Sequence, residues 1–268
     1  MDLIRPEWPA PANVQAAFTT RQGGVSQGVY QGLNLGLHVS DEPALVMQNR
    51  QLLTHQLALL AAPIWLEQVH GTDVFNADAP CVIPPKADAA VTTTVGLPLT
   101  VMTADCLPVL FCDKAGTVVA TAHAGWRGLC AGVLEKTIAA MPVAPDEILA
   151  WIGPAIGPTA FEVGDEVKAA FVAHDPQAAA AFVAHQNKWL ADLFMLARQR
   201  INAAGVSAVY GGNQCTFSDA QQFYSYRRDG QTGRMVGDLP VDRKRFWSLF
   251  AAVAAPMTAV LTALLYFL

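Results

Sequence analysis

The stretch PLTVMTADCLPVLFCDKAGTVVATAH (98–123) decides the fold class of this chain. It contains three closely spaced apolar runs, at 98–104, 108–112 and 117–123, that are rich in β-branched residues. Near-continuous apolar runs of this length are typical of sheet strands that are buried on both faces. The stretch therefore predicts the centre of a buried sheet.

Shorter strand patterns alternate with helix patterns on both sides of this stretch. Strands are predicted over 14–21, 64–69, 72–77, 88–94, 147–153 and 206–212, and helices over 45–60, with Asp41 as N-cap, and over 129–141, 163–174, 177–184 and 187–205. Such alternation is typical of α/β proteins. At 268 residues, we expect a single α/β domain with a mixed, mostly buried sheet that is flanked by helices.

The composition narrows the classes of partner and the cellular setting. Charged residues make up 15 % of the chain and the net charge is −5, so it lacks the basic surface that nucleic-acid phosphates require. The five cysteines are odd in number and form no CxxC pair, which argues against a disulfide framework. The acidic residue and prolines of MDLIRPEWPAP (1–11) do not fit a secretory signal. We expect a cytoplasmic protein without a nucleic-acid partner.

Three predicted strands end in side chains that are able to bind a metal ion. EQVHG (67–71) supplies His70, TADCLP (103–108) supplies Cys106, and AHAGWRG (122–128) supplies His123. Two imidazoles and one thiolate suit zinc, and three protein ligands leave a fourth position open, as in catalytic zinc sites. A metal-free alternative uses Cys106 as nucleophile and His123 as its base. A third reading, in which each is an ordinary buried residue, stays open at this point.

Four arginines lie in glycine-containing or aromatic segments, where they differ from arginines on predicted helices. They are Arg21, Arg127, Arg227 and Arg228. The planar guanidinium fork suits phosphate or carboxylate, so these residues are candidate contacts for an anionic substrate group, although surface ion pairs would explain each one singly. The segment FYSYRRDGQTGRM (223–235) also offers aromatic faces for a flat ring such as a purine.

Taken together, the motifs of this chain resemble the polyphenol-oxidase or laccase-domain family, also called the peptidoglycan editing factor family. The resemblance covers residues from about 14 to Met235 and rests on TTRQGGVSQGVYQGLNLGLHVSD, EQVHG, TADCLPVL, AHAGWRGL, IGPAIGPTAFEVGDEV, CTFSD and FYSYRRDGQTGRM, in that order. It implies a single α/β domain whose active-site layout is related to the cysteine hydrolase domain of bacterial cytotoxic necrotizing factors.

The same resemblance implies an activity and a site. It identifies His70, Cys106 and His123 as the metal-binding and catalytic trio, with zinc as the expected metal and copper as the alternative. It implies a purine nucleoside enzyme, both transferase and hydrolase, that catalyses phosphorolysis of adenosine, inosine and methylthioadenosine and hydrolytic deamination of adenosine. Two other activities assigned to the family are editing of peptidoglycan precursors, here an amide hydrolysis that uses Cys106, and copper-dependent phenol oxidation.

Residue chemistry ranks these activities. Multicopper oxidation needs many histidine ligands, whereas this chain has six histidines, four of them outside the trio's motifs, so phenol oxidation is the least favoured. Deamination needs a proton carrier beside the metal, for which Glu67 and Asp105 are the local candidates. Phosphorolysis needs cations that position phosphate. We expect a nucleoside and phosphate as the small-molecule partners.

The C-terminal segment departs from the family, whose members usually end soon after the GRM motif. Residues 246–268 form an uncharged, apolar stretch that follows three basic residues, and roughly 20 apolar residues suffice to span a bilayer. We therefore expect a catalytic domain over 1–242 and an apolar tail over 243–268. The tail is a candidate membrane anchor that would hold the protein at the inner face of a membrane; the alternatives are a terminal helix packed on the domain and an altered reading frame that replaced the family's usual last strand.

Overall fold

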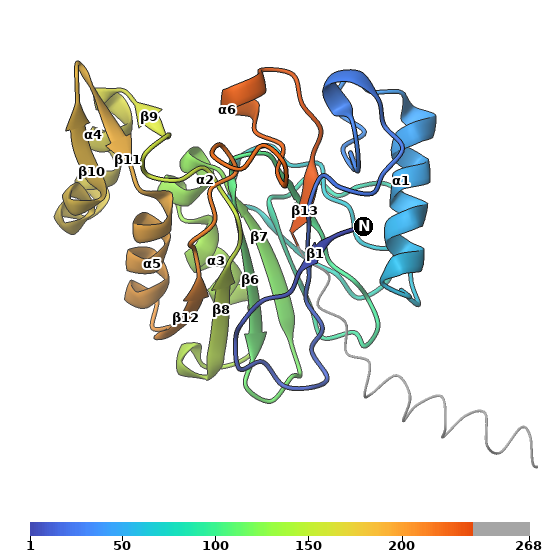
Figure 1. Cartoon of the computed structure of the whole chain (residues 1–268). Coiled ribbons are helices and arrows are strands. Elements are labelled where there is room, and N and C mark those ends of the chain that lie inside the picture. Colours follow the sequence, from blue (N-terminus) through green and yellow to red (C-terminus); the bar gives the residue numbers. More distant parts are fainter. Residues whose placement is uncertain (238–268) are drawn as a thin grey trace, which may run out of the picture.

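Two of the apolar runs in 98–123 form the middle of a six-stranded sheet in the computed structural model (Figure 1). Strand β6 (Leu107–Asp113) lies between β7 (Val119–Ala124) and β8 (Ile148–Ile152), antiparallel to both, and every residue of these three strands is buried. The sheet continues through β4 and β3 on one side and through β12 on the other; these are β3 (Val74–Asn76), β4 (Ala89–Thr92) and β12 (Ala208–Gly211). Because β3–β4 and β8–β12 are parallel pairs, the predicted mixed and buried sheet is confirmed.

The remaining run of the stretch enters a second sheet. Its strand β5 (Val101–Thr103) is the edge of a four-stranded sheet in the order β1-β2-β13-β5. The partners are β1 (Leu3–Ile4), β2 (Phe18–Thr19) and β13 (Met235–Gly237). The chain passes from this sheet to β6 through Asp105, whose φ is 92°. The stretch 98–123 thus joins the two sheets by one sharp turn.

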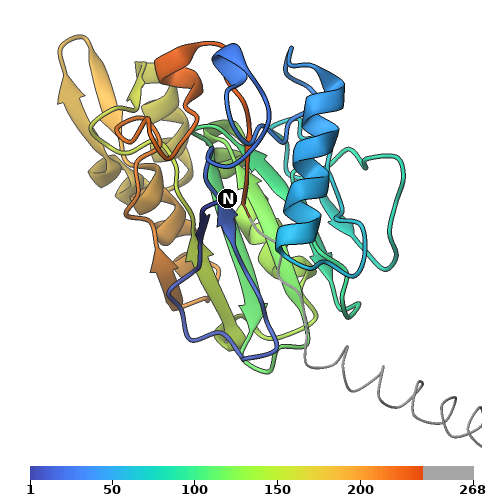
Figure 2. The same ribbon diagram turned by 45° about the vertical axis from the view of Figure 1, so that its right-hand side comes forward.

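The two faces of the six-stranded sheet are covered differently (Figures 1 and 2). On one face, helices α3 (Val133–Ala140) and α5 (Leu193–Ala203) pack their apolar side chains on β6, β7 and β8 in the largest core cluster. On the other face, Phe18 and Met235 of the small sheet pack against Leu110 of β6. Helix α1 (Pro43–Gln56) then buries Leu53 in a separate cluster with Met102 of β5. The domain therefore has a helix layer, two sheet layers and one outer helix.

The remaining elements are short and lie around this framework. A three-stranded sheet in the order β10-β11-β9 stands with α4 at one end of the molecule (Figure 1). The bounds of these and the other elements are β9 (Glu162–Val163), β10 (Phe182–His185), β11 (Lys188–Ala191), α2 (Trp126–Ala131), α4 (Asp165–His174), α6 (Tyr226–Asp229) and the 3₁₀ helices η1 (Gly28–Tyr30), η2 (Pro145–Glu147) and η3 (Pro176–Ala181).

The predicted helices over 177–184 and 187–205 are wrong in their boundaries. The first is a 3₁₀ helix followed by β10, and the second begins only at Leu193, because 188–191 forms the hairpin strand β11. The side chain of Asp192 accepts a hydrogen bond from the Met195 amide at 2.9 Å and so caps the shortened helix. Strand pairing outweighs the helical periodicity of this segment.

Three further predictions differ from the structure. Residues 64–69 form isolated bridges rather than a strand, and the helix predicted over 129–141 is divided in two at Gly132, whose φ is 100°. Asp41 does not cap α1, because Glu42 is the N-cap residue. The Asp41 carboxylate instead accepts hydrogen bonds from Ser26 at 2.6 Å and Asn34 at 2.8 Å. These two hydrogen bonds hold the loop that contains Ser26 and Asn34 next to the start of α1.

The structure describes residues 1–237. The predicted tail over 243–268, its proposed membrane contact through 246–268 and the domain boundary at 242 all lie outside the described residues. Within residues 1–237, no helix has the length and apolar character that crossing a bilayer requires.

Replacing Leu110 in the buried strand β6 tests the sheet-on-sheet core. We expect Leu110→Ala to lower the free energy of unfolding by about 2–5 kcal/mol, because the side chain is fully buried between the layers. Urea denaturation measures the change. Leu60→Ala, at a position that is 51 % exposed, is the matched control and should change stability by less than about 0.5 kcal/mol. Equal effects of the two substitutions would contradict the assignment of this core.

Candidate metal centre

The structure brings His70, Cys106 and His123 together. One possible ligand atom from each, two ring nitrogens and Sγ, lies within 4.8 Å of the others. Cys106 Sγ is 3.6 Å from His70 Nε2, and the two imidazole rings stand nearly perpendicular with centroids 4.7 Å apart. Within residues 1–237 this is the one group of three or more such side chains with metal-binding geometry. Three segments distant in sequence therefore meet at one point.

Each of the three residues is placed by a different element. His123 lies in β7 and is buried, opposite Pro108 of β6. Cys106 follows the turn between the two sheets and is half-buried. His70 is exposed in the loop after 64–69 and has a φ of 59°, a conformation that non-glycine residues seldom adopt. A strained backbone of this kind persists only where its surroundings fix it.

Asp88 supplies the contacts that fix the His70 loop. Its fully buried carboxylate accepts hydrogen bonds from the backbone amides of Val69 at 3.1 Å, His70 at 2.9 Å and Gly71 at 2.7 Å. The same carboxylate lies 2.8 Å from His123 Nδ1, and the Asp88 carbonyl accepts from the His123 amide. One side chain therefore orients the His123 ring, holds the backbone of His70, and leaves Nε2 of His123 for a metal ion or for Cys106.

Glycines allow the close approach of these segments. A Cβ atom on Gly125 would lie 2.6 Å from His70 Cδ2 and 3.2 Å from Cys106 Sγ, and one on Gly128 would lie 2.7 Å from the Gly71 carbonyl. Real side chains are not found at such distances, so the helix α2 that follows β7 can pack against the His70 loop only with glycine at these two positions. This packing accounts for the glycines of the AHAGWRG motif.

The electrostatics of the site favour opposite charges on Cys106 and His123. Burial would raise the pKa of the Cys106 thiol, but the charge and hydrogen bond of His123, with help from His70, lower it to about 6. Burial would likewise lower the pKa of His123, yet Cys106 and the hydrogen bond to Asp88 raise it to about 9. At neutral pH the protein without metal therefore holds a thiolate beside an imidazolium.

The donor set and its spacing fit a zinc ion. Zinc binds nitrogen at about 2.0 Å and sulfur at about 2.3 Å, so two such ligands at the tetrahedral angle lie roughly 3.6 Å apart. The His70 Nε2 to Cys106 Sγ distance of 3.6 Å matches this value. Copper also accepts imidazole and thiolate ligands. The site residues therefore fit either metal, and three donors leave one position for a substrate or water.

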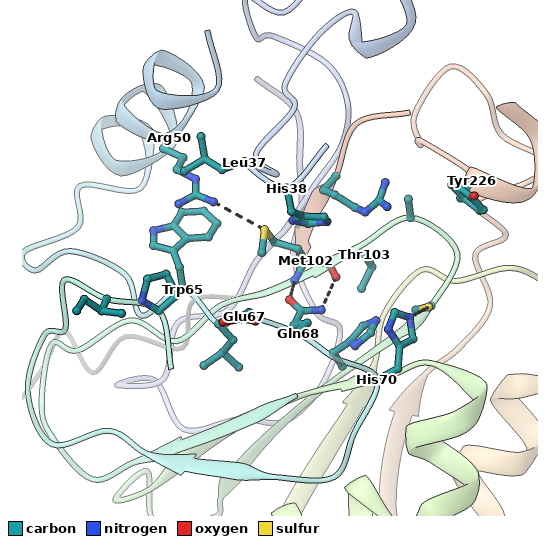
Figure 3. A pocket seen from close by; sticks show the side chains of 17 residues that line it. Leu37, His38, Arg50, Trp65, Glu67, Gln68, His70, Met102, Thr103 and Tyr226 are labelled. Atoms are coloured by element: carbon teal, nitrogen blue, oxygen red, sulfur yellow. Dashed lines mark hydrogen bonds between the residues drawn. The ribbon is translucent and has the colours of Figure 1, made fainter. Parts of the chain in front are cut away.

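A cavity of about 650 Å³ opens beside the trio (Figure 3). Trp65, Met102, Tyr226 and several aliphatic side chains give it a mostly apolar lining. In Figure 3, Arg50 and Trp65 lie at one end and His70 at the other, with His38 between them. The Arg50 guanidinium lies 3.5 Å from the centroid of the Trp65 ring. The size and lining suit a small organic molecule with a flat ring.

The two acids predicted as proton carriers have different surroundings. Glu67 lines the cavity and is the one carboxylate among the described residues that do so. The Asp105 carboxylate points into the protein, where it accepts hydrogen bonds from Thr216 and Ser225 hydroxyls and from the Arg227 amide at 2.7, 3.0 and 2.6 Å. Asp105 therefore holds the segments around the site together. Of these two acids, only Glu67 lines the cavity.

The structure does not place the four predicted arginines in this cavity. The Arg21 side chain donates to the carbonyls of Ala220 and Gln31, and Arg127 lies exposed over the Trp126 ring. Arg227 donates to the Glu162 carbonyl, and Arg228 donates to three carbonyls and pairs with Asp229. Contact of these four with a substrate stays a prediction.

The two arginines that do line the cavity are Arg50 and Arg234, and the sequence analysis missed both, as it missed Asp88. Arg50 lies on a predicted helix, where an arginine is usually a surface residue. Arg234 could have been predicted, because it stands in the same glycine-containing segment as Arg227 and Arg228.

A family comparison and a sequence comparison both match most of this chain. A family described as multi-copper polyphenol oxidoreductase laccase matches residues 15–240. The chain is 54 % identical over 234 residues to an Escherichia coli protein named purine nucleoside phosphorylase YfiH, with 87 % of this chain and 96 % of that protein covered. A Pseudomonas aeruginosa protein of the same enzyme name is 55 % identical over 235 residues, with 87 % and 96 % covered.

Solved structures show the same fold. A Neisseria meningitidis protein is 52 % identical and superposes with a TM-score of 0.87, covering 90 % of this chain and 100 % of its own. The protein YlmD from Geobacillus stearothermophilus is 32 % identical and has a TM-score of 0.85, covering 91 % and 97 %.

Neutralising Asp88 tests its role in holding the trio. We expect Asp88→Asn to weaken zinc binding by about 10–100-fold, because the amide neither orients His123 as a carboxylate does nor accepts all three backbone amides. Competition with a chromophoric chelator gives the affinity, and urea denaturation shows whether the variant is folded. Asp78→Asn, an exposed aspartate, is the control. Equal zinc affinity in the folded variant and in the control would refute this role.

The charge pair predicts the pH dependence of thiol reactivity in the protein without metal. Only the thiolate is alkylated, so the rate for Cys106 should rise with pH through a midpoint near 6, below the ordinary value of 9.0. Below pH 6 the thiol is protonated and the rate falls. Alkylation by iodoacetamide, followed by mass spectrometry of the Cys106 peptide, measures this. His123→Ala should move the midpoint upward, and an unmoved midpoint would show that His123 does not stabilise the thiolate.

Proposed function

This chain belongs to the multi-copper polyphenol oxidoreductase laccase family, and from that premise we propose that it is a metal-dependent purine nucleoside phosphorylase. The proposed substrates are adenosine, inosine and methylthioadenosine, with hydrolytic deamination of adenosine as a second reaction of the same site. The enzyme names of its relatives support the phosphorolysis. The proposed metal is zinc, with copper as the alternative, held by His70, Cys106 and His123.

The observation that carries this proposal is the position of the trio at one end of a mostly apolar cavity. A nucleoside places a flat, partly apolar base and a polar sugar in one molecule, and the cavity offers the Trp65 ring at one end for the base and the trio at the other for the polar end. The aromatic segment 223–235 supplies Tyr226 to the lining, and its stacking on a base stays a prediction.

In phosphorolysis, a phosphate oxygen forms a bond to the ribose C1′ while the bond from C1′ to the purine nitrogen breaks and its electron pair leaves with the base. Glu67 is the proposed carrier of the proton that the leaving purine takes up. Asp88 orients the His123 ring and holds the backbone of His70, which limits the movement that metal binding would require. A zinc or copper ion held by the three donors would supply Lewis acidity that polarises a bound oxygen.

Deamination uses the same residues on another part of the substrate. Water adds to C6 of adenosine, the bond from C6 to the exocyclic nitrogen breaks, and ammonia leaves with the proton. Glu67 is again the proposed proton carrier, because Asp105 is occupied by its three donors.

A second candidate function is editing of peptidoglycan precursors by amide hydrolysis, with Cys106 as nucleophile. The lowered pKa of the Cys106 thiol and its contact with His123 favour it. It also agrees with the predicted likeness to the cysteine hydrolase domain of cytotoxic necrotizing factors, which stays a prediction. Copper-dependent phenol oxidation is the least favoured, because the described residues offer a single three-donor cluster.

Product analysis tests the proposed phosphorolysis. Purified protein loaded with zinc should release adenine from adenosine only when phosphate is present, and inosine formed without phosphate would report deamination. Cys106→Ala should lower kcat/KM by more than about 100-fold, since losing a residue that merely orients a metal ligand costs about 10–100-fold. Chromatography of the products and metal analysis of each protein give the result.

Cys81→Ala is the matched control, because Cys81 is a half-buried thiol outside the trio, and it should keep both zinc and activity. Full activity of a Cys106→Ala protein would refute the proposed site. Release of no purine base with any nucleoside, together with cleavage of a muropeptide amide, would favour the editing function instead.

A further inference from the structure

A smaller hollow of about 200 Å³ adjoins the cavity of the candidate metal centre. His38, Tyr226 and Arg234 line both spaces, so the two are neighbours. The hollow is completed by Tyr30, Ser40 and Thr232, from the N-terminal loop and from the segment that follows α6. Its lining is about half polar, a larger share than in the mostly apolar main cavity. A molecule in the main cavity would therefore have a polar space beside it.

The Thr232 hydroxyl in this hollow has no protein partner. The residue is 2 % exposed, and its Oγ1 makes no hydrogen bond to the described part of the chain. A buried polar group without a partner costs roughly 1–3 kcal/mol, and native proteins retain few of them. Thr103, which lines the main cavity, also has an Oγ1 without a partner. A molecule bound in either space would therefore have an unpaired hydroxyl within the wall beside it.

Arg234 brings a positive charge that forms no ion pair with a described carboxylate. The ion pairs formed by residues 1–237 include neither Arg234 nor Arg50. The Arg234 side chain donates only through Nη1, to the carbonyls of Thr232 at 3.1 Å and Gly233 at 3.2 Å. A buried cation is costly unless an anion accompanies it. The Arg234 charge, which has no ion-pair partner among the described residues, therefore favours an anionic ligand.

The hollow lies close to the trio. Burial lowers the pKa of Arg234, and the nearby charges of Cys106 and Asp105 oppose that effect, so the guanidinium is within electrostatic reach of Cys106. His38 is held neutral, because burial and the charges of Arg234 and Arg50 lower its pKa to about 4. Because the His38 ring is neutral, the Arg234 guanidinium is the charged group of the hollow. That charge suits a small anion with several oxygens.

We propose that the hollow formed by Ser40, Tyr226, Thr232 and Arg234 is an oxyanion subsite that binds inorganic phosphate beside the metal centre. The Arg234 guanidinium and the three hydroxyls donate to the phosphate oxygens. This inference rests on the proposed phosphorolysis for its catalytic meaning, since phosphate held there would be the second substrate. It departs from the sequence-based expectation that Arg21, Arg127, Arg227 and Arg228 hold the anion.

Calorimetric titration of the full-length, zinc-loaded protein with inorganic phosphate tests the subsite directly. We expect Arg234→Gln to weaken phosphate binding by about tenfold or more, and Thr232→Val to weaken it by roughly fivefold. Steady-state kinetics should show the KM for phosphate rising to the same extent, with the KM for adenosine unchanged. A substitution that merely lowered the folded fraction would lower the apparent kcat and leave both KM values unchanged.

Two controls match the substitutions in chemistry. Thr121→Val removes another buried hydroxyl without a partner, in strand β7, and Arg5→Gln removes an arginine that donates to a carbonyl away from both cavities. Both should bind phosphate as the unaltered protein does. Circular dichroism shows that each variant is folded.

The outcomes separate this inference from the proposed function. Phosphate binding that Arg234→Gln abolishes, in a protein that releases no purine base, would support the subsite and refute the phosphorolysis. Phosphorolysis with an unchanged KM for phosphate in both variants would overturn the subsite alone. No phosphate binding by the unaltered protein, or binding of adenosine monophosphate without binding of inorganic phosphate, would also overturn it.

Discussion

The carboxylate of Asp88 is the constraint on which the site depends. It is a buried charge, and it is stabilised by three backbone amides of the His70 loop and by the His123 ring. The loop can hold His70 at a φ of 59° only because these bonds outweigh the strain. Since Asp88 stands directly before β4 of the central sheet, the rigid sheet fixes the His123 ring and the His70 backbone through one side chain.

Sequence patterns predicted the parts of this structure that depend on local composition. The apolar runs at 108–112 and 117–123 are central strands, because such runs can be buried only inside a sheet. The trio was predicted because each member stands at the end of a strand-like pattern in the sequence, where side chains often stay accessible, although His123 itself lies within β7 and is buried. The helix over 187–205 was misjudged at its start, since the pairing of 188–191 with β10 and β9 lies outside the sequence window that sets helical periodicity.

The residues that the sequence concealed act over long separations. Asp88 is 18 residues from the His70 amide that it accepts and 35 from His123, and nothing local marks it as more than a residue before a strand. Arg50 and Arg234 come from opposite ends of the described chain and meet only because α1 and β13 both pack on β5. Whether an arginine has an ion-pair partner depends on the assembled cavity, and neither composition nor residue spacing predicts it.

The place of β13 in the small sheet has a consequence for how the protein is made. This strand, at residues 235–237, is inserted between β2 and β5 rather than added at an edge. The sheet therefore cannot close during translation until nearly all of the described chain has left the ribosome, and Arg234 arrives at the same moment. Pairing over more than 200 residues makes folding slow. A nascent or truncated chain would hold the trio's segments without the wall that shapes their cavity.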